Sequence, residues 1–149
     1  MTVRVGVLLF SLLLVSCGGA KPESLGVNES RLGDCPDTPN CVSSEAGDDE
    51  HRVPHFRLKS YSPATWRTVG DQVAAMPRTD VVTVTDTYLH AECRSPILGF
   101  VDDLELKLRP REAQIQVRSA SRVGHSDLGV NRRRVEDLRK RLRAAGLIE

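Results

Sequence analysis

The chain has 149 residues, and its 21 lysines and arginines almost balance its 20 aspartates and glutamates. A near-neutral chain lacks the broad positive field on which nucleic-acid binding depends, so its charge argues against a nucleic-acid partner. The length suits one domain, and with only 4% aromatic residues its core must be mainly aliphatic.

The first 16 residues have the pattern of a signal peptide. Arg4 is the only charge before an apolar run from Val5 to Val15. That run fits the hydrophobic region of a signal peptide and is shorter than the roughly 20 residues of a transmembrane helix. It leads into Leu14-Val15-Ser16-Cys17, which matches a bacterial lipobox. We predict cleavage before Cys17 and lipid attachment to its thiol; an ordinary secretory signal with a chance cysteine is the alternative.

A lipid on Cys17 would place the protein in the cell envelope, with the membrane as its partner. Several acyl chains, such as palmitate, hold a protein stably on a bilayer where a single chain is marginal. Because Gly18 rather than an aspartate follows the cysteine, we expect the outer membrane, with the domain facing the periplasm. Residues 17–33 are predicted to be a flexible tether, and residues 34–146 a single domain.

The other three cysteines fall into a pair and a single residue. Cys35 and Cys41 flank five residues that include two prolines, and in an oxidising compartment such a pair is expected to form a disulfide. A redox-active pair and a metal site are alternatives, although the spacing does not match a zinc knuckle. Cys93 alternates with Leu89 and Ala91, which predicts a buried free thiol; a nucleophile is the alternative.

The first elements of the domain are predicted from alternation and helix signals. Residues 55–61 alternate as a strand. Ser62 and Pro63 form a helix start, and an apolar stripe beginning at Trp66 continues until Pro77 ends the helix. Residues 81–94 are rich in valine and threonine and predict one long strand. The parity of its apolar residues shifts midway, which indicates a bulge near residues 86–88.

Two further strands and a helix complete the prediction. Residues 100–108 form a strand with Phe100 and Leu104 on its core face, and residues 115–122 form the next one. A final helix begins between residues 129 and 131, ends near residue 145 and is capped by Gly146. Short turns between strands imply antiparallel pairing, and one apolar stripe per helix places both helices on one face. The predicted fold is a two-layer α+β domain with about four strands.

Period-two alternation gathers polar side chains on the opposite, open face of the sheet. Three of them, Arg94, Arg118 and Arg122, could hold an anionic small molecule or lipid headgroup through forked hydrogen bonds. A solvated face with cross-strand ion pairs is the plainer interpretation, and a surface for an envelope protein is a third. The full set is His90, Glu92, Arg94, Asp103, Glu105, Lys107, Arg118 and Arg122.

Some residues are candidates for acid–base chemistry or for shaping a site. His90 lies on the polar face with Asp103, whereas parity places Asp102 on the core face, where a carboxylate needs partners such as Ser119, Ser121 or helix amides. An envelope hydrolase that uses His90 and Asp102 is the alternative function. The sequence has no nucleophile-elbow, zincin or phosphate-loop pattern, and we predict no metal and no cofactor.

The joint before the last helix carries its own signals. Asp127 and Asn131 flank the helix start, where Asp127 can accept hydrogen bonds from amides and free amides can bind an anion. Arg132, Arg133 and Arg134 open the helix, where the macrodipole disfavours cations. We expect compensation from Glu136 and Asp137, or from an acidic ligand or lipid headgroup.

Three motifs carry a resemblance to a known family. They are "CPDTPNCVSS" (35–44), "YLHAECRSPILGFVDDLEL" (88–106) and "IQVRSASRVGHSDLGVNRRRVEDLR" (115–139). In this order they resemble the bacterial and plastid family called domain of unknown function 1499. The resemblance implies a small domain, often behind a lipoprotein signal or a membrane helix, with no established activity and no catalytic residues to carry over. The family more usually has another residue at position 93, so the resemblance argues against a functional thiol there.

Overall fold

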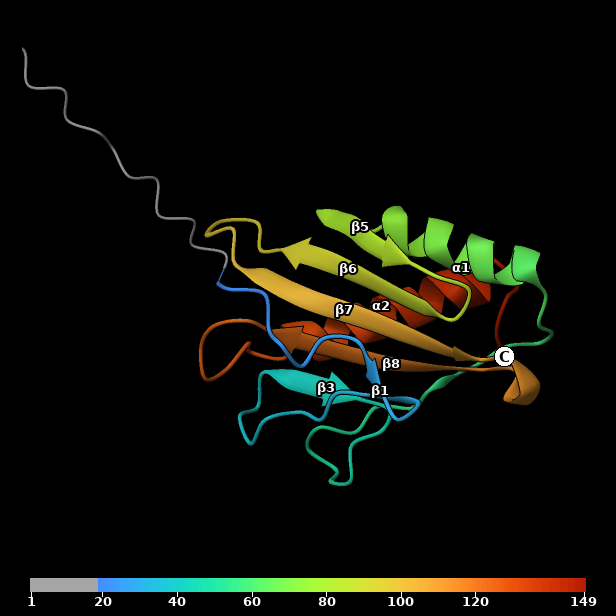
Figure 1. Cartoon of the computed structure of the whole chain (residues 1–149). Coiled ribbons are helices and arrows are strands. Elements are labelled where there is room, and N and C mark those ends of the chain that lie inside the picture. Colours follow the sequence, from blue (N-terminus) through green and yellow to red (C-terminus); the bar gives the residue numbers. More distant parts are fainter. Residues whose placement is uncertain (1–18) are drawn as a thin grey trace, which may run out of the picture.

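The computed structural model describes residues 19–149 (Figure 1). The predicted signal peptide and the lipid attachment site Cys17 lie outside the described residues. The main sheet is antiparallel with strand order β3-β8-β7-β6-β5, and β4 pairs with β8 beyond β3. The strands are β3 (Cys41–Ser43), β4 (Phe56–Arg57), β5 (Thr79–Val84), β6 (Tyr88–Arg94), β7 (Val101–Arg109) and β8 (Gln114–Ser121), with a 3-10 turn, η1 (Pro110–Glu112), between the last two.

Both helices cover the same face of this sheet, which confirms the α+β prediction (Figure 1). Helix α1 (Pro63–Ala74) begins as expected, with the Oγ of Ser62 accepting a hydrogen bond from the amide of Thr65. Helix α2 (Val130–Ala144) is followed by Gly146 at φ 72°, the left-handed conformation that glycine adopts without strain. Aliphatic side chains of the helices and sheet form one core, which includes Val69, Val73, Leu89, Leu104, Leu106, Ile115, Val117, Val135, Leu138 and Leu142.

The predicted long strand over residues 81–94 is wrong, because the chain reverses within it. Strands β5 and β6 form a hairpin in which Val84 pairs with Leu89. The turn between them is closed by hydrogen bonds between Thr85 and Tyr88. The parity shift that indicated a bulge therefore marks a turn. A smaller register shift occurs between Val81 and Thr83.

Other element boundaries also differ from the prediction. The first predicted strand is reduced to β4, and the sheet gains β3, whose three residues are too few to show a period. Phe100 was expected on the core face, but it precedes β7 and is exposed. The sheet therefore has six strands rather than about four.

A further layer lies on the sheet face opposite the helices. Strands β1 (Val27–Asn28) and β2 (Arg31–Leu32) form a small hairpin that crosses this face (Figure 1). Leu32 is buried, and the amide of Gly26 donates a hydrogen bond to the Oε1 of Glu105 at 2.8 Å. Part of the segment predicted to be a flexible tether is thus attached to the domain, through buried Leu32 and through the hydrogen bond from Gly26 to Glu105.

Candidate functional site

The polar face of the sheet carries a largely buried set of ion pairs and hydrogen bonds, here called the front network: Tyr88, His90, Glu92, Asp103, Glu105, Arg118 and Arg122. Arg122 donates from Nε and Nη2 to the two carboxylate oxygens of Asp103, at 2.9 and 2.7 Å, and from Nη2 to Glu92 at 2.6 Å. Arg118 donates from Nη1 to Glu105 at 2.9 Å. Each of these two arginines already has a carboxylate partner.

The front network is closed to solvent by the chain that crosses it. The side chains of His90 and Asp103 are 2% and 1% exposed, and their Nε2 and Oδ1 atoms lie 2.7 Å apart. Glu105 is fully buried and accepts hydrogen bonds from the amide of Gly26 and the hydroxyl of Tyr88. The predicted open face is therefore covered, and His90 has no access to a substrate in this structure.

The electrostatics of the front network follow from this pairing. Burial alone would raise the pKa of Asp103, but hydrogen bonds from Arg122 and His90 outweigh it and hold that pKa below its usual value. Burial and the neighbouring Glu105 carboxylate raise the pKa of Tyr88. The hydrogen bonds to Asp103 raise the pKa of Arg122 despite its burial. These groups keep their ordinary charge states at neutral pH and stabilise one another.

The three arginines predicted to hold one anion do not converge on a free site. Arg118 and Arg122 are neutralised within the front network, whereas Arg94 is exposed at the end of β6 and pairs with Glu92 and Asp80. A hollow of about 350 Å³ lies beside Arg118 and Arg122, but Asp34 and Asp103 also line it. Its balanced charge does not favour an anion.

The cysteines take the places expected from the sequence. Cys35 and Cys41 form a disulfide, with their Cα atoms 5.6 Å apart, which confirms the predicted pair. Cys93 is free and buried. Burial raises the pKa of its thiol, and the hydroxyl of Thr79 lies 3.5 Å from its sulfur. A buried thiol with a raised pKa is a poor nucleophile at neutral pH.

A second polar cluster lies between the sheet and α2. Asp102 accepts a hydrogen bond from Nη2 of Arg134 at 2.6 Å, so the expected partners Ser119 and Ser121 were wrong. Both serines instead bond the side chain of Asn131. Because Asp102 and His90 project from opposite faces of the sheet, the structure does not bring the proposed acid and base together.

Asp127 and Asn131 fix the start of α2. The carboxylate of Asp127 accepts hydrogen bonds from the amides of Gly129 and Asn131 at 2.8 and 2.7 Å, which confirms the predicted cap. The amide group of Asn131 reaches the carbonyl of Asn40. These residues join α2 to the sheet and to the disulfide loop, and they leave little of the helix start free for an anion.

The least compensated charge lies in a groove of about 560 Å³ between α2 and the neighbouring ends of β5 and β6. We call it the basic groove. It is lined by six cationic residues and one carboxylate, that of Asp137. The cationic residues are Arg78, Arg94, Arg133, Arg134, Lys140 and Arg141.

Half of these cations lack a carboxylate partner. Arg78 donates to the carbonyl of Arg94, and Arg133 donates to the carbonyl of Leu128. Among residues 19–149, neither of them nor Arg141 forms an ion pair with an acidic side chain. The basic groove therefore carries positive charge that residues 19–149 do not neutralise.

One comparison with known proteins identifies the chain. A family model described as "Protein of unknown function (DUF1499)" matches residues 31–142, most of the sequence. The chain belongs to this family. No curated protein and no solved structure matches it. In the described part of this DUF1499 chain, no helix is long and apolar enough to cross a membrane, and no group of three metal-ligating side chains is assembled.

Sequence reasoning did not find the basic groove of this DUF1499 chain, although it contained part of the signal. The run Arg132, Arg133 and Arg134 at the helix start indicated a need for compensation. Arg133, Asp137 and Arg141 are spaced by four and share one helix face. Arg78 and Arg94 join that face from other elements. These residues meet through tertiary contacts, which the periodicity of a single segment cannot predict.

Proposed function

We propose that the chain is a lipid-anchored protein of the cell envelope whose basic groove binds a phosphate-bearing anion, either a small molecule or a lipid headgroup. The observation that carries this proposal is the charge of the groove, six cations against one carboxylate, with three arginines that form no ion pair in the described chain. Guanidinium groups hold phosphate oxygens through paired hydrogen bonds.

The proposed anion site lies at a different place from the one expected from the sequence. Of the three arginines predicted for that site, Arg94 lines the groove, whereas Arg118 and Arg122 belong to the front network. Arg134 supports the groove wall through its ion pair with Asp102. Arg78, Arg133 and Arg141 are the residues that we assign to direct anion contact.

The envelope location is supported by the lipobox that ends at Cys17 and by the Cys35–Cys41 disulfide, since disulfides persist in oxidising compartments. Anchoring is tested by expressing the full chain in a bacterium with a two-membrane envelope and feeding an alkyne analogue of palmitate. The wild type and Cys93→Ala should carry the label in the outer-membrane fraction, and Cys17→Ala should carry none. Equal labelling of Cys17→Ala would contradict the anchor.

The anion site is tested by titrating the full chain in a zwitterionic detergent with inorganic phosphate and following backbone amide shifts by NMR. We expect the shifts to map to the groove, with a Kd on the order of 1 mM. Arg133→Gln/Arg141→Gln should weaken binding by about tenfold or more, because each charge-assisted hydrogen bond contributes about 1.5 kcal/mol or more.

The matched control is Arg67→Gln/Arg143→Gln, which removes the same charge from exposed positions that do not line the groove. It should bind phosphate as the wild type does. Equal weakening by the two double variants would show that binding follows net charge alone, and the proposed site would be wrong. Shifts that map to the front network would also contradict it.

A further inference from the structure

The most exposed apolar side chains of the described chain gather at one end of the molecule. Ile97, Leu128 and Leu98 are 90%, 84% and 61% exposed, the three highest values among its large hydrophobic residues. They belong to the loops 95–100 and 122–129, which follow β6 and β8. These two strands run in the same direction and stop at the same end of the sheet (Figure 1). Exposed apolar residues are normally scattered singly, whereas a cluster marks a contact surface.

Leu128 is held outward at an energetic disadvantage. Its φ is 54°, a left-handed conformation that leucine rarely adopts. Hydrogen bonds from the amide of Leu128 to the hydroxyl of Ser126, and from Arg133 to the carbonyl of Leu128, support this conformation. Glycine or asparagine would adopt it with less strain. A contact outside the domain would account for a large exposed leucine at this strained position.

The proposed anchor enters at the same end. Gly19 lies against the second loop, because a Cβ built on it would come within 2.9 Å of the side chain of Val123. Cys17 precedes Gly19 by only two residues in the sequence. A lipid on Cys17 would thus enter the bilayer beside these loops.

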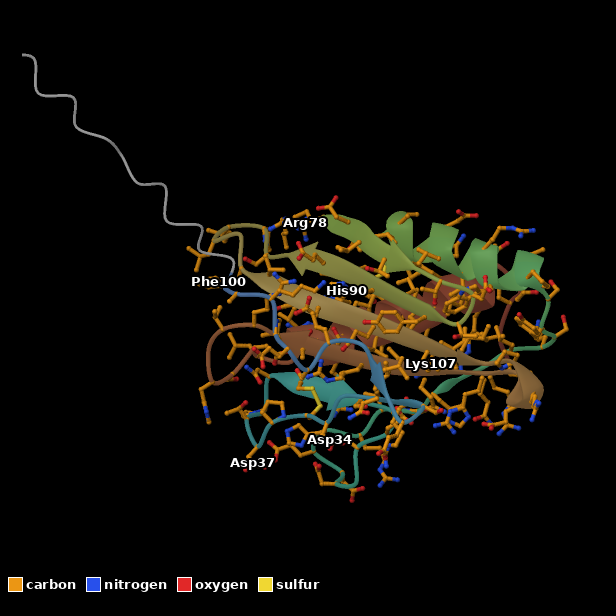
Figure 2. All side chains as sticks on the ribbon, in the orientation of Figure 1. Asp34, Asp37, Arg78, His90, Phe100 and Lys107 are labelled. Atoms are coloured by element: carbon orange, nitrogen blue, oxygen red, sulfur yellow. A yellow bond between two sulfur atoms is a disulfide. The ribbon has the colours of Figure 1, made fainter. Side chains whose placement is uncertain are left out.

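The lining of the basic groove includes residues from this end as well. Pro96 of the first loop and Val130, which follows the second, line it together with Arg94 and Arg133. Figure 2 shows Arg78 and Phe100 at this same end of the sheet. Apolar residues flanked by cations match the layering of a bilayer surface, where acyl chains lie beneath anionic headgroups.

We propose that the loops 95–100 and 122–129 insert into the headgroup interface of the bilayer beside the lipid anchor, so that the basic groove faces anionic headgroups. This inference deepens the proposed function and rests on it for the anchor and for the headgroup as the source of phosphate. It orients the domain: the β5–β6 turn points away from the membrane. The seven residues of β6 separate that turn from the first loop by six steps of about 3.4 Å, or roughly 20 Å.

The test measures the depth of a fluorescent probe in the full chain, reconstituted in phosphatidylcholine vesicles that contain phosphatidylglycerol. An environment-sensitive dye is attached at Leu98→Cys, and in a matched variant at Asp86→Cys in the β5–β6 turn. Lipids that carry quenchers at known depths report position. We expect the dye at residue 98 about 5–10 Å into the interface, as for other interfacial segments, and the dye at residue 86 beyond the reach of the quenchers.

A second arm places the same dye at residue 98 in Arg133→Gln/Arg141→Gln and in a chain that carries Leu128→Glu. Leu128→Glu should move the probe out of the bilayer, because a charge replaces an inserted apolar group. In the groove variant the probe should stay inserted but lie shallower. Its depth should also differ less between vesicles with and without phosphatidylglycerol. Equal quenching at residues 98 and 86, or no effect of Leu128→Glu, would overturn the inference. Phosphate binding by the groove could still hold in that case, so the two proposals fail separately.

Discussion

The front network and the basic groove both contain arginines, but those of the front network are buried and paired with carboxylates, whereas several in the groove are at least partly exposed and unpaired in the described chain. In the front network, Arg118 and Arg122 are buried and each contacts a carboxylate. In the basic groove, Arg133 and Arg141 lie at the surface of α2 and form no ion pair in the described chain. Arginines that the fold has neutralised stabilise it, whereas arginines left uncompensated remain available to a ligand.

The difference follows from what covers each region. The β1–β2 segment crosses the front network and removes its charges from water, which costs several kcal/mol per ion unless each finds a partner. Glu105 accordingly has Arg118, Tyr88 and the amide of Gly26 as donors. Nothing in residues 19–149 covers the basic groove, so its cations remain hydrated and can exchange water for phosphate.

The largest effect is expected when a carboxylate of the front network loses its charge. Glu105→Gln keeps the shape and the acceptor oxygen but leaves Arg118 buried without a counter-ion. We expect the free energy of unfolding to fall by about 3 kcal/mol, since removing one partner of a buried pair typically costs 3–5 kcal/mol. Chemical denaturation of the full chain in detergent measures it.

The control for this variant is Glu112→Gln, which removes an exposed carboxylate from the loose pair with Arg109. Such surface pairs contribute less than about 1 kcal/mol. If Glu105→Gln were no more destabilising than Glu112→Gln, the front network would not be the source of stability inferred here. Phosphate binding in the basic groove should survive both substitutions.

A second prediction concerns the disulfide next to the covering segment. Cys35→Ser/Cys41→Ser should lower the free energy of unfolding by about 2 kcal/mol, because a short closed loop restrains the unfolded chain only modestly. The loss is measured by comparing denaturation of this variant with that of the oxidised wild type, and the reduced wild type should match the variant. Equal stability of oxidised and reduced wild type would contradict it. No residue of this loop lines the groove, so the groove should bind phosphate unchanged.

Local patterns in the sequence were sufficient for both helices and for the buried faces of β6, β7 and β8. Ser62 and Pro63 located the start of α1, and the single apolar stripe predicted for the last helix is the buried face of α2, which includes Val135, Leu138 and Leu142. These features depend on residues within one or two turns of each other. The Cys35–Cys41 pair was also predictable because its ends are close along the chain.

The candidate site was less predictable because it depends on contacts between distant segments. Alternation placed Arg118 and Arg122 correctly on one face, but not the hairpin that covers them. A glycine amide that binds a carboxylate 79 residues away leaves no local signature. For the same reason, the sequence showed an arginine run at the start of α2 without showing that Arg78 and Arg94 would join it.

A third prediction uses pH to separate the two regions. The folded-state pKa of Asp103 is held low by Arg122 and His90, against the effect of burial. Its contribution to stability is therefore complete above the unfolded pKa, near 3.9, and is lost as pH falls through the lowered folded value. The Tm of the wild type should therefore fall as the pH is lowered through that acidic window. Asp103→Asn should have a lower Tm than the wild type at neutral pH, and its Tm should change less with pH in the acidic window. An identical change of Tm with pH in the two proteins would contradict the role assigned to Asp103.

The smallest effect, and the one of opposite sign, is expected in the basic groove. Arg133 lies in the first turn of α2, where the helix macrodipole disfavours a cation by a few tenths of a kcal/mol. Arg133→Gln should therefore leave the free energy of unfolding unchanged or raise it slightly, whereas Arg143→Gln in the last turn should lower it by a similar amount. Paired denaturation curves at low salt measure both.

The sign of this change bears on why Arg133 is present. A residue that stabilises the fold is expected to lower stability when it is removed, as Glu105 is. If Arg133→Gln instead keeps or gains stability while phosphate binding weakens, then the charge of the groove opposes folding and serves a ligand. A loss of more than about 1 kcal/mol would exceed what a surface charge contributes. That result would place Arg133 with Arg118 and Arg122, as part of the scaffold.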